Sequence, residues 1–281
     1  MILVTGITGQ LGYDVVKELE RRGEDFIGTT RKEIDLSDPE SAKNFILEKK
    51  PDAVIHCAAY TAVDKAEDEA ELALTVNGLS TRKIAEACKE IGAKMLYIST
   101  DYVFGGDGET PYEISDEKAP QNIYGKSKLL GEDSVIALLR NYFIVRISWV
   151  FGSNGKNFVK TMLNFDKRRK KISVVDDQIG SPTYTADLAP LLVDMIKSEK
   201  YGIYHATNEG FCSWAEFAEE IFKQAGYKTA VEKIPTSDYP TPAKRPFNSR
   251  LSKKSLDDAG FKRLPTWQDA ITRFLADYKK K

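Results

Sequence analysis

Residues 2–12 read ILVTGITGQLG, an apolar, β-branched run that passes directly into three glycines spaced three residues apart. The run at residues 2–5 predicts a buried strand, and residues 10–22 predict the helix after the turn. In such a turn the first glycine permits a sharp bend, the second lets backbone approach a pyrophosphate, and the third allows close packing of helix on sheet. The helix N-terminus would face the negative charge, although a purely structural turn is the alternative interpretation. The residues expected to contact a dinucleotide here are Gly6, Gly9, Gln10, Leu11 and Gly12.

The rest of the first half continues this alternation of short apolar runs and longer helical patterns, as parallel βαβ units require. After about residue 152 the segments become less regular. We therefore predict an α/β fold with a Rossmann-type, doubly wound parallel sheet in a dinucleotide-binding domain of residues 1–151. Residues 152–281 are predicted to form a smaller, mixed α/β substrate-binding lobe that returns some segments to the sheet. Further strands are expected at residues 26–30, 53–59, 94–100 and 143–150.

The charge composition argues against a nucleic-acid partner. The chain has 281 residues, with 41 basic and 42 acidic side chains and a net charge of −1. Proteins that bind nucleic acid through bulk electrostatics carry a basic excess instead. The densest basic run, at residues 167–171, is predicted to be a solvated helix end.

Cysteine and histidine are scarce. Three widely separated cysteines and two histidines predict neither a disulfide framework nor a metal site. The sequence lacks a signal-peptide pattern and an apolar run long enough to span a membrane. We expect a cytoplasmic protein without a membrane partner.

The end of the second predicted strand bears on the choice of cofactor. An acid at this position would bind a ribose 2′-hydroxyl and repel a 2′-phosphate. Here the segment reads TTRK at residues 29–32, with no acid before Glu33. Arg31 can pair with a 2′-phosphate, so we expect NADPH, with NADH and a merely solvated basic turn as the alternatives. Asp35 and Leu36 are expected to contact the adenine.

A tyrosine and a lysine four residues apart are the candidate acid–base groups. Tyr124 and Lys128 lie in a predicted helix, where this spacing places them on one face. A neighbouring cation lowers the pKa of a phenol, which can then donate a proton to a ketone oxygen. Thr100 ends a predicted strand at the sheet edge where ligands collect. Asn77 is expected near the cofactor, with core capping as an equal alternative.

The order of these elements resembles the short-chain dehydrogenase/reductase family, and the length resembles its extended, sugar-nucleotide branch. Five further blocks resemble the dTDP-4-dehydrorhamnose reductase family over nearly the whole chain. They are AAYTAVDKAE at residues 58–67, STDYVF at 99–104, RISWV at 146–150, DQIGSPT at 177–183 and RPFNSRL at 245–251.

The resemblance implies reduction of the 4-keto group of dTDP-4-dehydro-L-rhamnose to dTDP-L-rhamnose. It implies that Tyr124 protonates the carbonyl oxygen, that Lys128 holds the nicotinamide ribose and lowers the tyrosine pKa, and that Thr100 orients the ketone. The remaining implied cofactor contacts are Ala58, Ala59 and Tyr60. The implied substrate contacts are Ser99, Tyr102, Phe104, Trp149, Gln178 and Arg250.

Other activities occur on similar chains. A dehydratase would want a glutamate two residues after Thr100, where this sequence has Tyr102. A sugar-nucleotide epimerase, and a non-catalytic subunit resembling the β subunit of methionine adenosyltransferase, stay open as alternatives. The resemblance leaves a homodimer and a magnesium requirement open; Asp14 and Glu18 are interpreted as ordinary acids on a helix surface.

Overall fold

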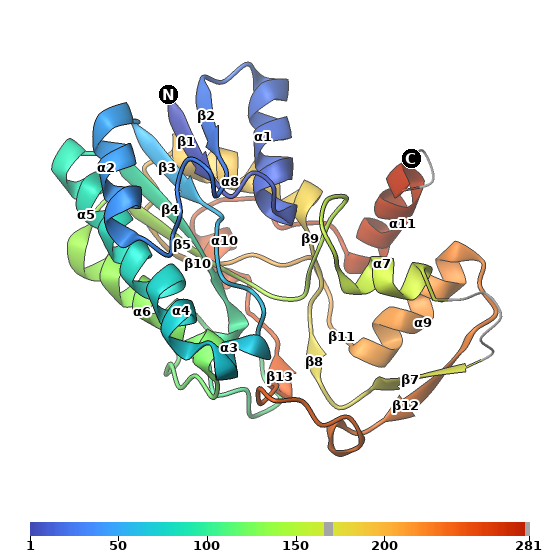
Figure 1. The fold of residues 1–281 in the computed structure, drawn as a ribbon. Coiled ribbons are helices and arrows are strands. Elements are labelled where there is room, and N and C mark those ends of the chain that lie inside the picture. Colours follow the sequence, from blue (N-terminus) through green and yellow to red (C-terminus); the bar gives the residue numbers. More distant parts are fainter. Residues whose placement is uncertain (166–170, 279–281) are drawn as a thin grey trace.

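The central sheet has the predicted parallel form, with five strands from the first half of the chain and one from the second. The computed structural model of the protein describes residues 1–165 and 171–278. A six-stranded, all-parallel sheet has the order β10-β5-β4-β3-β1-β2 (Figure 1). The predicted Rossmann-type fold is therefore confirmed. The strands are β1 (Ile2–Thr5), β2 (Phe26–Thr29), β3 (Ala53–His56), β4 (Lys94–Thr100), β5 (Tyr142–Ile147) and β10 (Gly202–His205).

Helices cover both faces of this sheet, which explains why every residue of β1 is buried and why three of its four residues are apolar. One face packs against α2 (Pro39–Lys49), α5 (Ser80–Ile91) and α6 (Ile123–Leu138). The opposite face packs against α1 (Gln10–Arg22) and α8 (Thr185–Lys197). Both α8 and β10 follow residue 152, so the second half of the chain supplies a helix and a strand to the first layer (Figure 1).

The remaining second half forms a separate body beside the sheet (Figure 1). Its apolar core is rich in aromatic side chains from three helices and short strands. The helices are α7 (Phe158–Leu163), α9 (Trp214–Ala225) and α11 (Trp267–Tyr278). The paired strands are β6 (Val150–Phe151) with β9 (Thr183–Tyr184), β7 (Lys171–Val175) with β12 (Ala230–Ile234), and β8 (Ile179–Gly180) between β11 (Cys212–Ser213) and β13 (Asn248–Ser249). Of the basic run at residues 167–171, the first four residues lie outside the described part, and Lys171 begins a strand rather than ending a helix.

The segment between β3 and β4 is a chain of short helices. These are α3 (Lys65–Asp68), α4 (Ala70–Leu74) and a π-helical turn at Thr75–Leu79, which leads into α5. Such π turns concentrate at functional sites, and this one carries Asn77. The other short helices are the 3₁₀ turns Asp101–Val103 and Thr236–Asp238, and α10 (Lys254–Asp258).

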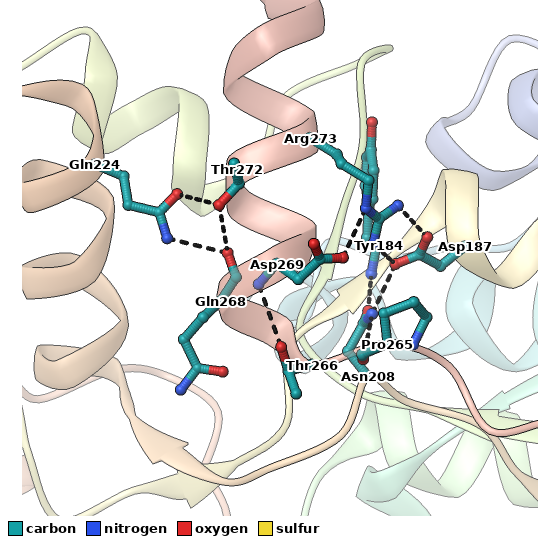
Figure 2. A network of polar contacts seen from close by, with 10 residues as sticks. All are labelled: Tyr184, Asp187, Asn208, Gln224, Pro265, Thr266, Gln268, Asp269, Thr272 and Arg273. Atoms are coloured by element: carbon teal, nitrogen blue, oxygen red, sulfur yellow. Dashed lines mark hydrogen bonds and ion pairs between the residues drawn. The ribbon is translucent and has the colours of Figure 1, made fainter.

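The C-terminal helix is fastened to the start of α8 by a polar network (Figure 2). The Arg273 guanidinium of α11 forms an ion pair with the nearly buried Asp187 of α8. Asn208 donates to the same carboxylate at 2.7 Å and accepts a hydrogen bond from the Tyr184 backbone N–H, also at 2.7 Å. The second body is thereby joined to the sheet layer through side chains distant in sequence.

Two acids on α1 do not lie where the sequence analysis put them. Asp14 is 6% exposed and accepts a hydrogen bond from Thr185 of α8, and Glu18 is 7% exposed. The guanidinium groups of Arg21 and Arg22 hydrogen-bond the Glu18 carboxylate, which lowers its pKa. The surface interpretation was wrong because α8, from the second half of the chain, covers this face of α1.

Candidate active site

The glycine turn between β1 and α1 has no room for side chains. Gly6 has a φ of 71°, and a Cβ there would lie 2.8 Å from the Ala58 Cα. A Cβ on Gly12 would lie 2.3 Å from the Gly6 carbonyl oxygen. Helix α1 begins at this turn without a side-chain cap and without an acid in its first turn. Its N-terminal N–H groups are therefore suited to an anion.

A cleft of about 880 Å³ runs from this turn along the carboxyl ends of the strands. Its size falls in the range of pockets that hold cofactors and substrates. Sixteen residues predicted from the sequence line it: Gly6, Gly9, Gln10, Leu11, Gly12, Arg31, Asp35, Leu36, Ala58, Ala59, Tyr60, Ser99, Thr100, Tyr102, Tyr124 and Lys128.

Tyr124 lies in the first turn of α6, beside the end of β4. Its ring contacts the Tyr102 ring edge-on at 5.5 Å between centroids. Burial, together with the negative charge of Asp101, raises the pKa of Tyr124 well above its ordinary value of 10.0, and a hydrogen bond with Thr100 opposes part of the rise. The phenol is therefore fully protonated at neutral pH in this structure.

Lys128 lies one turn further along α6 and is only 3% exposed. Its Nζ lies 4.0 Å from the centroid of the Tyr97 ring, and burial lowers the pKa of the ammonium to about 7. Within the described residues it takes part in no ion pair. A buried amine that lines a cleft and forms no ion pair is suited to an anionic or hydroxyl-rich ligand.

A buried ion pair lies behind these two residues. Glu132, one turn after Lys128, accepts two hydrogen bonds of 2.8 Å from the Arg146 guanidinium of β5. Ser99 also donates to Glu132, at 2.5 Å. The exposed fractions of the two charged side chains are 0% and 1%. The negative charge of Glu132 supports the ammonium form of Lys128, so the network links the strand ends to the acid–base helix.

Five predicted residues do not line the cleft. Asn77 binds the Tyr60 backbone N–H and C=O at 2.8 and 3.0 Å and donates to Ser127 at 2.9 Å, so it ties the loop after β3 to α6. The other four are Phe104, Trp149, Gln178 and Arg250.

These four side chains contact other groups of the protein. Phe104 is 2% exposed and stacks on Tyr112. Trp149 has a φ of 48° and stacks on Trp214 at 3.8 Å between ring centroids. Gln178 donates to Thr236, and Arg250 donates to Asn248, both at 3.0 Å. Their roles toward a substrate stay predictions.

Asp101 is a site residue that the sequence analysis did not assign. It is 3% exposed and lines the cleft. Its Oδ1 accepts a hydrogen bond from the Thr100 hydroxyl at 2.9 Å, and its Oδ2 has no partner among the described atoms. Burial raises the pKa of this carboxyl to about 6. The sequence feature that could have identified Asp101 as a site residue is its position directly after Thr100, at the end of a strand.

The raised pKa predicts how Asp101 affects stability. The folded protein binds this proton below about pH 6, whereas the unfolded chain releases it near 3.8. Ionisation of Asp101 therefore costs stability as pH rises from about 4 to 6. Asp101→Asn cannot ionise, so as the pH rises from about 4 to 6 we expect the free energy of unfolding of this variant, relative to that of the wild type, to increase by about 2 kcal/mol. Urea unfolding of both proteins at pH 4.5 and 7 measures this, and an equal difference at both pH values would contradict it.

The described residues hold no group of three or more His, Cys, Asp or Glu side chains that could bind a metal ion. Among the described helices, none has the length and apolar character needed to cross a bilayer. The three cysteines are free.

Known proteins of one family match this chain over nearly its whole length. Residues 1–280 match the family described as the RmlD substrate binding domain. The spore coat polysaccharide biosynthesis protein SpsK of Bacillus subtilis (strain 168) is 40% identical, over 98% of this chain and 97% of that protein. The dTDP-4-dehydrorhamnose reductase of Escherichia coli (strain K12) is 37% identical, over 98% and 96%. A crystal structure of dTDP-4-dehydrorhamnose reductase from Bacillus anthracis str. Ames in complex with NADP is 43% identical, covers 98% of each chain and superposes with a TM-score of 0.95.

Proposed function

Because the chain belongs to the dTDP-4-dehydrorhamnose reductase family, we propose that it reduces the 4-keto group of dTDP-4-dehydro-L-rhamnose to dTDP-L-rhamnose with NADPH. One observation carries the proposal: a single cleft holds the glycine turn together with Thr100, Tyr124 and Lys128. Reduction of a ketone needs a hydride source and a proton source side by side. The cleft offers room for both.

The residues present fit a nicotinamide dinucleotide. The glycine turn excludes side chains where a pyrophosphate would approach the start of α1. Lys128 is a buried cation without an acidic partner among the described residues, so it suits the ribose hydroxyls. When bound, NADPH supplies the hydride that adds to carbon 4 of the sugar.

The proton for the C4 oxygen comes from Tyr124. Its raised pKa keeps the phenol protonated until the oxygen gains negative charge. Thr100, whose hydroxyl lies beside the Tyr124 phenol, orients the ketone oxygen against that phenol. Lys128 then stabilises the phenolate by its charge, and solvent returns the proton. The expected lowering of the Tyr124 pKa by Lys128 is not observed in this structure, where burial and the charge of Asp101 raise that pKa and Lys128 is not among the groups that shift it.

Asp101 adds a contact to the sugar. Asp101 lines the cleft, and its buried Oδ2 forms no hydrogen bond of good geometry with the described atoms, although Ser249 lies close enough to favour the carboxylate. A buried carboxylate oxygen without a hydrogen bond is costly, so a donor from the ligand is favoured there. A sugar hydroxyl beside the ketone supplies such a donor. Tyr102 and Trp149 are proposed to border the sugar, and the dTDP moiety extends toward the second body.

Turnover of dTDP-4-dehydro-L-rhamnose with NADPH tests the activity. We expect a fall in nicotinamide absorbance that matches dTDP-L-rhamnose one to one. A sugar-nucleotide epimerase would isomerise its substrate without net consumption of NADPH. A binding subunit resembling the methionine adenosyltransferase β subunit would bind ligands without turnover. Either result would replace the proposal.

Arg31 is expected to select NADPH over NADH. Its side chain is 79% exposed and lies 3.4 Å from Asp35, so it is free to turn toward a 2′-phosphate at the mouth of the cleft. Arg31→Ala should raise the Kd for NADPH about tenfold, because a charge-assisted contact to phosphate is lost, and leave the Kd for NADH nearly unchanged. Isothermal titration with both cofactors measures this, and equal losses would show that Arg31 does not bind the 2′-phosphate.

A further inference from the structure

A short turn from the second half of the chain lies over the glycine turn. Residues 152–157 join β6 to α7. The Asn154 side chain donates to the backbone oxygens of Thr8 and Gly9, at 2.8 and 3.2 Å. Asn157 donates to the Gln10 side chain at 2.9 Å. We call residues 152–157 the strap, because these bonds fasten it across the start of α1.

The strap is held in shape by its own contacts. Asn157 caps α7 by accepting a hydrogen bond from the Lys160 backbone N–H at 3.0 Å. The Lys160 ammonium donates to the backbone oxygens of Ser153 and Gly155, at 2.8 and 2.7 Å. Gly155 has a φ of 68°, and a Cβ there would lie 3.2 Å from the Gln10 Cγ. The turn therefore lies against the glycine turn in one defined conformation.

This conformation places a lysine at the cleft. Gly155 and Lys156 line the same cleft as Gly9, Gln10 and Gly12. Lys156 is exposed, and its ammonium has no hydrogen bond or ion pair to the described residues. Arg31, which also lines the cleft, differs from Lys156 because its guanidinium already lies 3.4 Å from the Asp35 carboxylate. Lys156 is thus a cation without a partner in residues 1–165 and 171–278, and it is carried by a segment that is hydrogen-bonded to the glycine turn.

We propose that Lys156 binds the pyrophosphate of the dinucleotide, so that the second half of the chain contributes directly to cofactor affinity. The inference rests on the proposed NADPH binding. Backbone N–H groups at the start of α1 carry only partial charges, whereas the ammonium adds a full charge. Asn154 is the positioning residue, because it holds the strap to the carbonyl groups of the glycine turn.

Calorimetric titration of the protein with NADPH and with NADH at low salt tests the role of Lys156 without turnover. We expect Lys156→Gln to raise the Kd for both cofactors by the same factor, about tenfold, because both contain the pyrophosphate. The loss should shrink as salt is added, since an exposed charge contact is screened. Asn154→Ala should also raise the Kd for NADPH and the Kd for NADH, because it releases the strap from the glycine turn.

The controls separate this inference from other causes. Lys228→Gln removes an exposed lysine of the second body that does not line the cleft, and it should leave both Kd values unchanged. Thermal unfolding of Lys156→Gln should match wild type. Unchanged affinities, or a loss for NADPH alone, would overturn the proposal. Failure of the proposed function would instead appear in the wild-type protein, as no binding of either cofactor.

Discussion

Tyr124→Phe is expected to lower kcat for the ketone reduction about a hundredfold or more, while the Kd for NADPH changes little. The substitution removes one oxygen and its proton from a ring that is otherwise retained. That hydroxyl lies at the strand-end Thr100, and its raised pKa keeps it protonated at neutral pH. Without it, water must protonate the C4 oxygen in a buried cleft. Single-turnover oxidation of NADPH measures the rate, and calorimetry measures the affinity.

A matched substitution shows whether the effect is local. Tyr239 is 60% exposed and does not line the cleft, so Tyr239→Phe should leave both kcat and the Kd unchanged. Thermal unfolding of the two variants should agree within the error of the measurement. A Tyr124→Phe protein with full turnover would remove Tyr124 as the proton donor, and Thr100 or Asp101 would have to be tested in its place.

Glu132→Gln is expected to cost about 3–5 kcal/mol of unfolding free energy, because it leaves a buried arginine without its carboxylate. The pair is 0% and 1% exposed, and Glu132 accepts hydrogen bonds from both Arg146 and Ser99. An amide can accept some of these bonds but carries no charge to balance the guanidinium. Urea unfolding monitored by tryptophan fluorescence measures the loss.

Two further variants show that the buried charge is the cause. The double variant Glu132→Gln with Arg146→Met removes both charges, and it should recover part of the loss. Asp258→Asn breaks the exposed contact with Lys254, whose side chain is 67% exposed, and should change stability by less than about 1 kcal/mol. A loss below about 1 kcal/mol for Glu132→Gln would contradict the importance of the pair.

Buried charge also connects stability to the acid–base site. Glu132 supports the ammonium form of Lys128, and Asp101 influences the pKa of Tyr124. Neither acid was assigned from the sequence, because an acid one turn from a lysine, or next to a threonine, is common on exposed helices and loops. Only their burial at the strand ends shows that their charges act on the candidate catalytic groups.

Part of this protein follows from local sequence. Each of the first strands is a short apolar run, and glycines were required at Gly6 and Gly12 because their backbones make close contacts. The parallel sheet, the helix carrying Tyr124 and Lys128, and the strand end at Thr100 could therefore be predicted, since these depend on periodicity and on the chain order of βαβ units. The family blocks extended this to the reaction.

What only the tertiary structure decided is which polar groups meet. Burial of Asp14 and Glu18 depends on α8, more than 160 residues later in the chain, as the Asp14–Thr185 contact shows. The strap over the glycine turn joins Asn154 to Thr8 across a sequence separation of 146 residues. Periodicity records which side of an element faces the core, but it carries no information on which distant polar side chain lies opposite. That partner is set by the packing of whole elements, and here the packing gave Asp101, Glu132 and Lys156 their surroundings.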